Sequence, residues 1–423
     1  MKIYSEDYNA FSIIGLIFIA MGIIFNEWTI AKLFSHDGSI NNPSQKIIIW
    51  CFDVIAVFIG FIIIRYKHHV KQIGREIVFT VVTFIIFLFL LEGGMRMYHY
   101  FNSLQDSRKV DFTEQLGWKT QENWSWTRSQ VEPRTGEIYK VVFSTTKYGF
   151  RVFGDTNTKK FKIFVLGDSY THGTTVSDGY TYYDYLKKNH KNIEIFAFGT
   201  GGYGSLQEYM ILDKYFDEIK PDMILWQFCS NDLINNSYEL ESLSYRNNDR
   251  NFRPYYNRHN GQITLLYPRQ DLGWIYRIIQ HSHLLKFLNI RLDILKVEQG
   301  ETIEEYLKID DPLAIEAVET TSAIMGLVRK RAGNIPIVTF PIDRGVQIPW
   351  LHNTFSEISR EHSMHYIGHV PDMLVEAQSK GIIVDAPNNP HWNDVGSAIV
   401  GKTILDHLIE NKLLEKNISS RNN

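Results

Sequence analysis

The chain has 423 residues, 44% of them hydrophobic and 22% charged, and its 44 Lys and Arg against 47 Asp and Glu give a formal net charge of −3. This composition excludes a disordered chain, a collagen-like repeat and a strongly basic nucleic-acid-binding protein. Two cysteines are too few for a disulfide framework. The length allows about two or three domains.

Three apolar runs occupy the first hundred residues, at about 8–28, 47–64 and 77–98. A helix needs about 20 largely apolar residues to cross the hydrocarbon core of a bilayer, and each run comes close to this length. A cleavable signal peptide would explain the first run only. We therefore predict that residues 1–101 form a membrane anchor of three transmembrane helices.

The loop between the second and third runs is basic and contains Arg65, Lys67, Lys71 and Arg75. Cytoplasmic loops are enriched in Lys and Arg, so this loop is expected to face the cytoplasm. Everything after the third run is then expected to lie on the other side of the membrane.

The rest of the chain alternates strand-like and helix-like segments. We predict a β-rich connector at 102–160, an α/β domain at 161–412 with an insertion at about 240–310, and a polar tail at 413–423. Short apolar stretches predict strands at 161–166, 193–198, 223–228 and 335–340, with amphipathic segments between them. Such alternation predicts a parallel sheet covered on both faces, in three flavodoxin-like layers. Functional residues are then expected just beyond the carboxyl ends of the strands.

The first of these strands runs into Gly-Asp-Ser at residues 167–169. A serine at a strand-to-helix turn suits a nucleophile, because its hydroxyl and its own N–H can face the same space. Ser169 as a simple helix cap is the competing interpretation. His172 is a possible local base, but we favour a position on the surface of the first helical turn.

The second strand ends in a glycine-rich turn at residues 199–204, which matches the G-x-G-x-x-G pattern of dinucleotide-binding proteins. Two features argue against a nucleotide. The turn does not follow the first strand, and the next strand does not end in the acid that would bind a ribose. Backbone N–H groups offered to a developing anion explain the glycines equally well.

Two further polar residues follow predicted strands or loops. Asn231 comes directly after the third strand, where its amide can donate to an oxyanion or form an ordinary Asx turn. His391 lies in a loop before the last helix, where it can reach a serine as a general base or remain simply solvated.

With this order of Ser, Gly, Asn and His, the chain resembles the SGNH/GDSL hydrolase superfamily. Three further motifs resemble its membrane-anchored bacterial branch: Leu-Glu-Gly-Gly-Met-Arg at 91–96, Tyr-Gly-Phe-Arg at 148–151 and Arg-Pro-Tyr-Tyr at 253–256. The resemblance covers roughly residues 88–412. It implies that Ser169 is the nucleophile and that the Ser169 N–H, the Gly202 N–H and the Asn231 side chain form an oxyanion hole. His391 would be the base. It also implies a multi-pass protein of the bacterial cytoplasmic membrane with an extracytoplasmic catalytic domain.

The sequence departs from the family pattern in two places. Cys229 stands where the third block has glycine, and Asn388 stands where the family has an acid three residues before the histidine. An amide can orient an imidazole but supplies no charge. Asn388 or Asp385 can orient His391, a Ser–His dyad can work alone, or catalysis can be weak or lost; we favour Asp385 or the dyad.

No metal or cofactor is expected. His362, His365 and His369 lie close in sequence, but residues 364–370 read as a strand, so the three would not share a face. Tyr255 and Tyr256, in the insertion, are candidates for stacking on a sugar.

The sequence therefore predicts a membrane-anchored serine esterase that removes acyl groups, with acetyl favoured, from a glycan or lipid of the cell envelope. Its partners would be that acylated substrate and the membrane, and no nucleic acid. One alternative is an O-acyltransferase that acetylates a surface polysaccharide at the same Ser–His site. A second alternative is a non-catalytic glycan-binding or export accessory protein.

Overall fold

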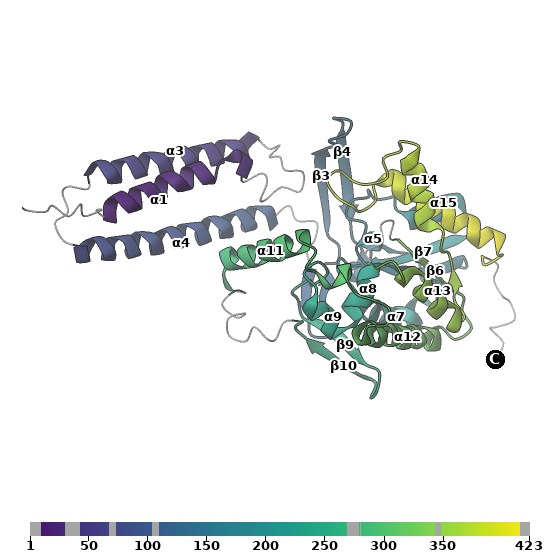
Figure 1. The fold of residues 1–423 in the computed structure, drawn as a ribbon. Helices are drawn as coiled ribbons and strands as arrows, with labels where there is room; N and C mark the ends of the chain where they lie inside the picture. Colours follow the sequence, from purple (N-terminus) through teal and green to yellow (C-terminus); the bar gives the residue numbers. More distant parts are fainter. Residues whose placement is uncertain are drawn as a thin grey trace, which may run out of the picture. The chain divides into compact units, whose positions relative to one another are not determined.

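A computed structural model describes residues 10–29, 43–66, 73–103, 110–268, 279, 281–342 and 348–414. The chain divides into two compact units (Figure 1). The first consists of residues 1–101 and 278–291, and the second of residues 102–277 and 292–423.

The first unit is helical. It contains α1 (Ala10–Ile24), α3 (Pro43–Tyr66), α4 (Ile73–Ser103) and the first part of α11 (His283–Glu298). Helices α1 and α3 approach closely where Gly15 meets Gly60. A Cβ on Gly15 would lie 2.7 Å from the Gly60 carbonyl oxygen, and one on Gly60 would lie 2.6 Å from the Gly15 oxygen. Small residues at a crossing point let two apolar helices approach each other at backbone distance.

Among the described residues, one helical segment is long and apolar enough to cross a membrane, namely Phe79–Tyr98 in α4, and none of it is buried. The apolar segment Ser12–Ile24 is shorter. Each predicted run thus contains a helix, but the prediction of three spanning helices stays a prediction. Most of the basic loop on which the predicted orientation depends, residues 67–72, lies outside the described residues.

Glu92 is an acid within the apolar part of α4, and its carboxylate binds the beginning of α11. It accepts hydrogen bonds from the N–H groups of His283 (3.0 Å) and Leu284 (2.9 Å) and from the Ser282 hydroxyl (2.8 Å). It also accepts one from Arg96 Nε at 2.8 Å. The carboxylate therefore satisfies N–H groups that the first turn of a helix leaves without partners.

The second unit contains a six-stranded sheet in the order β12-β11-β8-β6-β7-β5 among the described residues. Its strands are β5 (Val152–Phe153), β6 (Phe161–Gly167), β7 (Ile193–Gly199), β8 (Met223–Phe228), β11 (Ile337–Pro341) and β12 (His365–Tyr366). Pairing is parallel throughout except for β5, which runs antiparallel to β7 at the edge. The prediction of a purely parallel sheet is thus corrected to a mixed one. Only residues 154–160 connect β5 to β6, and this is too short for the crossover that parallel strands require.

Helices cover both faces of this sheet. They are α6 (Tyr182–Asn189), α7 (Ser205–Ile219), α12 (Pro312–Ala332), α13 (Leu351–Glu361), α14 (Val370–Ser379) and α15 (Asp394–Glu410). Successive side chains of β6 alternate between two cores. Phe164 and Leu166 pack with α7, α12 and α13, whereas Ile163 and Val165 pack with α6, α14 and α15. A strand buried on both faces reads as a continuous apolar run, which explains the pattern seen in the sequence.

Three antiparallel pairs and several short helices complete the unit. The connector holds β1 (Val110–Thr113) with β2 (Gly117–Thr120) and β3 (Ser125–Val131) with β4 (Ile138–Ser144). The insertion holds β9 (Arg253–Asn257) with β10 (Gln262–Leu266). The remaining short helices are α5 (Ser169–His172), α8 (Ser230–Asn236) and α9 (Tyr238–Leu243), with 3₁₀ turns at Lys147–Gly149 and Ile303–Glu305. Most of the predicted polar tail, residues 415–423, lies outside the described residues.

Candidate active site

Ser169 is the first residue of α5, the single helical turn that follows β6. The Asp168 side chain caps this turn by accepting a hydrogen bond from the Tyr170 N–H at 3.0 Å. Gly173, in the left-handed conformation, ends it. The turn packs tightly on the end of β7: a Cβ on Gly199 would lie 2.3 Å from the backbone nitrogen of His172. The strand-to-helix turn thus holds the Ser169 hydroxyl at the carboxyl edge of the sheet.

His391 meets this serine from the loop before α15. Its Nε2 lies 2.7 Å from Ser169 Oγ. The imidazole also lies against the Tyr170 ring, with ring centroids 4.5 Å apart, and the Tyr170 hydroxyl donates to the Pro390 carbonyl at 3.3 Å. The loop that carries the histidine is therefore packed onto the residue next to the serine.

Asn389 binds the other ring nitrogen of His391. Its Oδ1 lies 2.6 Å from Nδ1 and 2.9 Å from the His391 backbone nitrogen. A backbone N–H only donates, so the amide atom that faces it must be the oxygen. The same oxygen then accepts from Nδ1–H. The resulting tautomer leaves a lone pair on Nε2, which can accept the proton of the Ser169 hydroxyl.

This residue is neither Asp385 nor Asn388, the two candidates that the sequence suggested for this position. The Asp385 carboxylate accepts a hydrogen bond from Gln378 Nε2 at 3.0 Å, and the residue forms an antiparallel bridge with Trp392. Asn388 adopts the left-handed conformation (φ 53°) in the same loop. One signal in the sequence pointed to Asn389: an asparagine two residues before the histidine can bind the histidine N–H in an Asx turn.

The glycine-rich turn after β7 lies beside the nucleophile. A Cβ on Gly201 would lie 3.9 Å from Ser169 Cβ. Gly202 has φ +76°, and a Cβ there would lie 2.5 Å from the Asp249 carboxylate, so a side chain at this position would strain the backbone and displace Asp249. The Gly202 N–H has no hydrogen-bond acceptor among the residues that the structure describes.

Asn231 is the second residue of α8, directly after β8. Its Nδ2 donates to Asn235 Oδ1 at 3.0 Å. A primary amide carries two N–H donors, so a second one remains for an anion. Because β8 pairs with β6, the end of β8 lies next to the end of the strand that Ser169 follows.

The sequence around these residues matches a known protein family. A model described as GDSL-like Lipase/Acylhydrolase matches residues 163–404, more than half of the 423 residues. The chain belongs to the GDSL-like lipase/acylhydrolase family. It is therefore a hydrolase of ester bonds. A search of the curated proteins finds no match.

Several solved structures resemble this GDSL-family chain. A lipolytic protein of the G-D-S-L family from Veillonella parvula is 13% identical, with a TM-score of 0.34, over 58% of this chain and 96% of its own. A family 3 carbohydrate esterase from Clostridium thermocellum is 10% identical, with a TM-score of 0.34, over 60% and 97%. The acetyl xylan esterase AlAXEase is 13% identical, with a TM-score of 0.35, over 58% and 99%.

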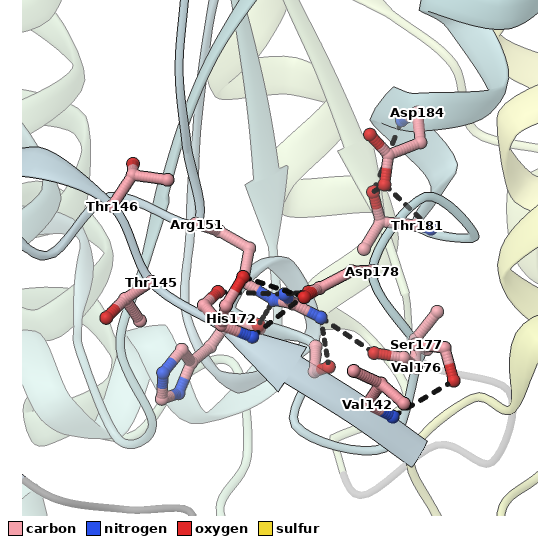
Figure 2. A network of polar contacts seen from close by, with 12 residues as sticks. Val142, Thr145, Thr146, Arg151, His172, Val176, Ser177, Asp178, Thr181 and Asp184 are labelled. Carbon is pink, nitrogen blue, oxygen red and sulfur yellow. Dashed lines mark hydrogen bonds and ion pairs between the residues drawn. The ribbon is translucent and has the colours of Figure 1, made fainter. Parts of the chain in front are cut away.

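Arg151 fixes the far side of the nucleophile turn in this hydrolase (Figure 2). The side chain is buried, and it donates to the carbonyl oxygens of His172 (3.1 Å) and Val176 (2.7 Å). It also pairs with Asp178 and lies over the Phe143 ring, 4.0 Å from its centroid. One guanidinium therefore connects the end of α5 to the loop that follows it. The contacts of this arginine become visible only in the fold.

His172 is buried rather than on the surface, which removes it as an accessible base. Burial is the main cause that lowers its pKa from 6.5 to about 3, and the nearby Arg151 and His391 charges add to the shift. Between about pH 3 and pH 6.5 the imidazole therefore stays neutral in the folded protein, whereas it binds a proton in the unfolded chain.

This burial predicts acid destabilisation. The stabilising effect of a neutral His172 is complete above pH 6.5 and is lost as the pH falls towards 3. The slope is about 1.4 kcal/mol per pH unit. His172→Gln, which does not titrate, should lose less stability over this range in thermal unfolding of the full chain. Wild-type and variant curves are expected to run parallel above pH 7, and parallel curves at all pH values would contradict the assignment.

Tyr255 and Tyr256, the predicted sugar-stacking residues, differ in exposure. Tyr255 is buried, its hydroxyl donates to Glu241 at 2.9 Å, and its ring contacts Tyr238. The ring of Tyr255 is therefore not available to stack on a sugar, which corrects that expectation. Tyr256 is partly exposed on β9.

Proposed function

We propose that this protein is a membrane-anchored serine esterase that removes acyl groups, acetyl in particular, from a glycan or lipid of the cell envelope. The observation that carries the proposal is the chain of contacts from Ser169 Oγ to His391 Nε2 and from His391 Nδ1 to Asn389 Oδ1. These contacts lie beside a glycine turn in which the Gly202 N–H has no acceptor among the described residues.

The proposed reaction has two halves. As Ser169 Oγ attacks the ester carbonyl, its proton passes to His391 Nε2, which then protonates the departing alcohol. Water enters by the same base-assisted route and releases the acid from the acyl-enzyme. The negative charge on the carbonyl oxygen would be stabilised by the N–H groups of Ser169 and Gly202 and by the Asn231 amide.

Asn389 would orient the imidazole and set its tautomer without supplying a charge. A carboxylate in this position also stabilises the imidazolium that forms during the attack. The proposed enzyme therefore works with a neutral orienting group, as cysteine proteases with a Cys-His-Asn site do.

Residues 1–101 supply the proposed anchor in the bacterial cytoplasmic membrane. The apolar and unburied segment Phe79–Tyr98 supports it. The basic residues between the second and third runs favour an extracytoplasmic catalytic domain. A reporter fused after Asn423 tests this orientation, and activity of a cytoplasmic reporter would contradict it.

The substrate class follows from charge and chemistry. Residues 102–423 hold 36 Lys and Arg and 40 Asp and Glu, a balance of −4, which gives no electrostatic reason to expect an anionic polymer. Neutral acetylated glycans are therefore the first candidates.

The test uses the detergent-solubilised full chain with p-nitrophenyl acetate and with an acetylated glycan. We expect release of acetate from both, and none with Ser169→Ala. Transfer of acetyl to an added sugar in preference to water would favour the acyltransferase. No release by either protein would favour a non-catalytic accessory role.

A further inference from the structure

The peptide between Gly201 and Gly202 is bound from outside the parallel sheet. Trp118, on β2 of the connector, donates its Nε1–H to the Gly201 carbonyl oxygen at 3.1 Å. A trans peptide is planar, and its C=O and N–H point in opposite directions. The bond from Trp118 on one side of this peptide thus sets the direction of the Gly202 N–H on the other side.

The next peptide is bound by Arg253, on β9 of the insertion. Its Nη2 donates to the Gly202 carbonyl oxygen at 2.7 Å. Both peptides that flank Gly202 therefore have their carbonyls fixed by a side chain from a different segment. Glycine has a wider range of accessible backbone angles than other residues, so without these two bonds the direction of the Gly202 N–H would vary.

Arg253 is itself held rigidly. It is 1% exposed, its Nη1 donates to Gln207 Oε1 at 2.6 Å, and its guanidinium forms ion pairs with Glu241 (2.7 Å) and Asp249 (2.6 Å). A planar guanidinium is well suited to such a set of partners, because its donors point in fixed directions.

Trp118 and Arg253 also contact each other. The guanidinium carbon of Arg253 lies 4.8 Å from the centroid of the Trp118 ring. The Tyr203 hydroxyl donates to the Trp118 carbonyl at 2.6 Å. Trp118 is therefore bonded to residues on both sides of Gly202, namely Gly201 and Tyr203. These contacts link the glycine turn, the connector and the insertion into one network.

We infer that Trp118 and Arg253 are positioning residues that aim the Gly202 N–H at the oxyanion. The inference rests on the proposed function, because it takes the Gly202 N–H as an oxyanion donor. Neither side chain needs to touch the substrate. The connector and the insertion then contribute to transition-state stabilisation, although they carry no residue of the Ser–His pair.

The test compares Trp118→Phe with Trp126→Phe in the full chain. Phenylalanine keeps an aromatic ring and removes the indole N–H. Trp126, on β3 of the same connector, is a matched control, since its Nε1 has no hydrogen-bond partner among the described residues. Misdirecting one oxyanion donor should lower kcat roughly 10- to 100-fold, with KM little changed. Trp126→Phe should retain the wild-type kcat.

A second measurement distinguishes a misdirected Gly202 N–H from a general loss of activity. p-Nitrophenyl thionoacetate places sulfur, a poor hydrogen-bond acceptor, where p-nitrophenyl acetate places the oxyanion. Trp118→Phe should therefore lower the oxygen-to-sulfur rate ratio roughly tenfold, since the loss falls on the oxygen ester. The pH dependence of kcat should not move, because His391 keeps its contacts. Arg253→Lys should lower the ratio in the same direction, with thermal unfolding measured alongside because its ion pairs change.

Two outcomes would overturn the inference, and they are distinguishable. If Trp118→Phe matches Trp126→Phe in kcat and in the rate ratio while Ser169→Ala is inactive, the esterase stands and the positioning role fails. If Ser169→Ala hydrolyses both esters as fast as the wild type, the proposed function fails and the inference fails with it.

Discussion

Ser169→Ala is expected to lower kcat for p-nitrophenyl acetate by roughly 10⁴- to 10⁶-fold, because alanine has no hydroxyl with which to form the acyl-enzyme. His391 should then lose its partner at Nε2 while its Nδ1 bond to Asn389 is unaffected. The measurement is steady-state hydrolysis by the full chain. Intact-mass analysis after treatment with a fluorophosphonate should find one adduct on the wild type and none on the variant.

Ser379→Ala provides the control for this substitution. Ser379 is an exposed residue at the end of α14, and its hydroxyl donates to the Glu376 carbonyl at 2.7 Å. Its rate and labelling should match those of the wild type. If Ser169→Ala were still labelled at one site, the nucleophile would be a different residue.

The positions of the central strands along the chain, and the polar residues that follow them, could be predicted from the sequence. Strands β6, β7 and β8 are buried on both faces, so each reads as a continuous apolar run. Parallel strands present their carboxyl ends at one edge, which is why Ser169 and Asn231 were expected near each other. The positions of these motifs follow from periodicity and turn chemistry, both of which are local properties.

The identity of the group behind His391 could not be predicted in the same way. Family resemblance directs attention to the position three residues before the histidine, which Asn388 occupies. In the fold, Asn388 takes a left-handed backbone conformation, and the side-chain oxygen of the next residue, Asn389, binds the backbone nitrogen and the ring Nδ1 of His391. Which of the two neighbouring asparagines binds His391 depends on the local backbone conformation, and this conformation cannot be read from the residue types.

Burial was the second source of error. His172 and Tyr255 are polar residues near turns, and the sequence pattern suggested exposure for both. His172 packs edge-on against Phe143, and Tyr255 donates to the buried Glu241. Phe143 lies in the connector, 29 residues before His172 in sequence, and segments so far apart cannot be paired from a periodic pattern. The partners that satisfy a buried polar group become visible only in the fold.

Asn389 is expected to set the orientation and the tautomer of the His391 imidazole. Asn389→Ala should lower kcat roughly 100-fold, because the imidazole loses the acceptor that fixes its orientation and tautomer. Asn389→Asp should instead raise kcat at alkaline pH. A carboxylate at 2.6 Å from Nδ1 would stabilise the imidazolium and raise the pKa of the base by about one unit or more. The acidic limb of the kcat profile should therefore move to higher pH, with a faster plateau.

Asp385→Asn and Asn388→Gly distinguish this assignment from the two positions that the sequence suggested. Glycine tolerates the left-handed conformation of residue 388, so the loop is expected to keep its shape. Asparagine retains the Asp385 side-chain oxygen that accepts from Gln378. Both variants should keep most of the wild-type kcat and an unshifted pH profile. If Asp385→Asn instead lost activity to the extent expected for Asn389→Ala, a carboxylate would act on His391 during turnover, and the neutral Ser–His–Asn mechanism would have to be abandoned.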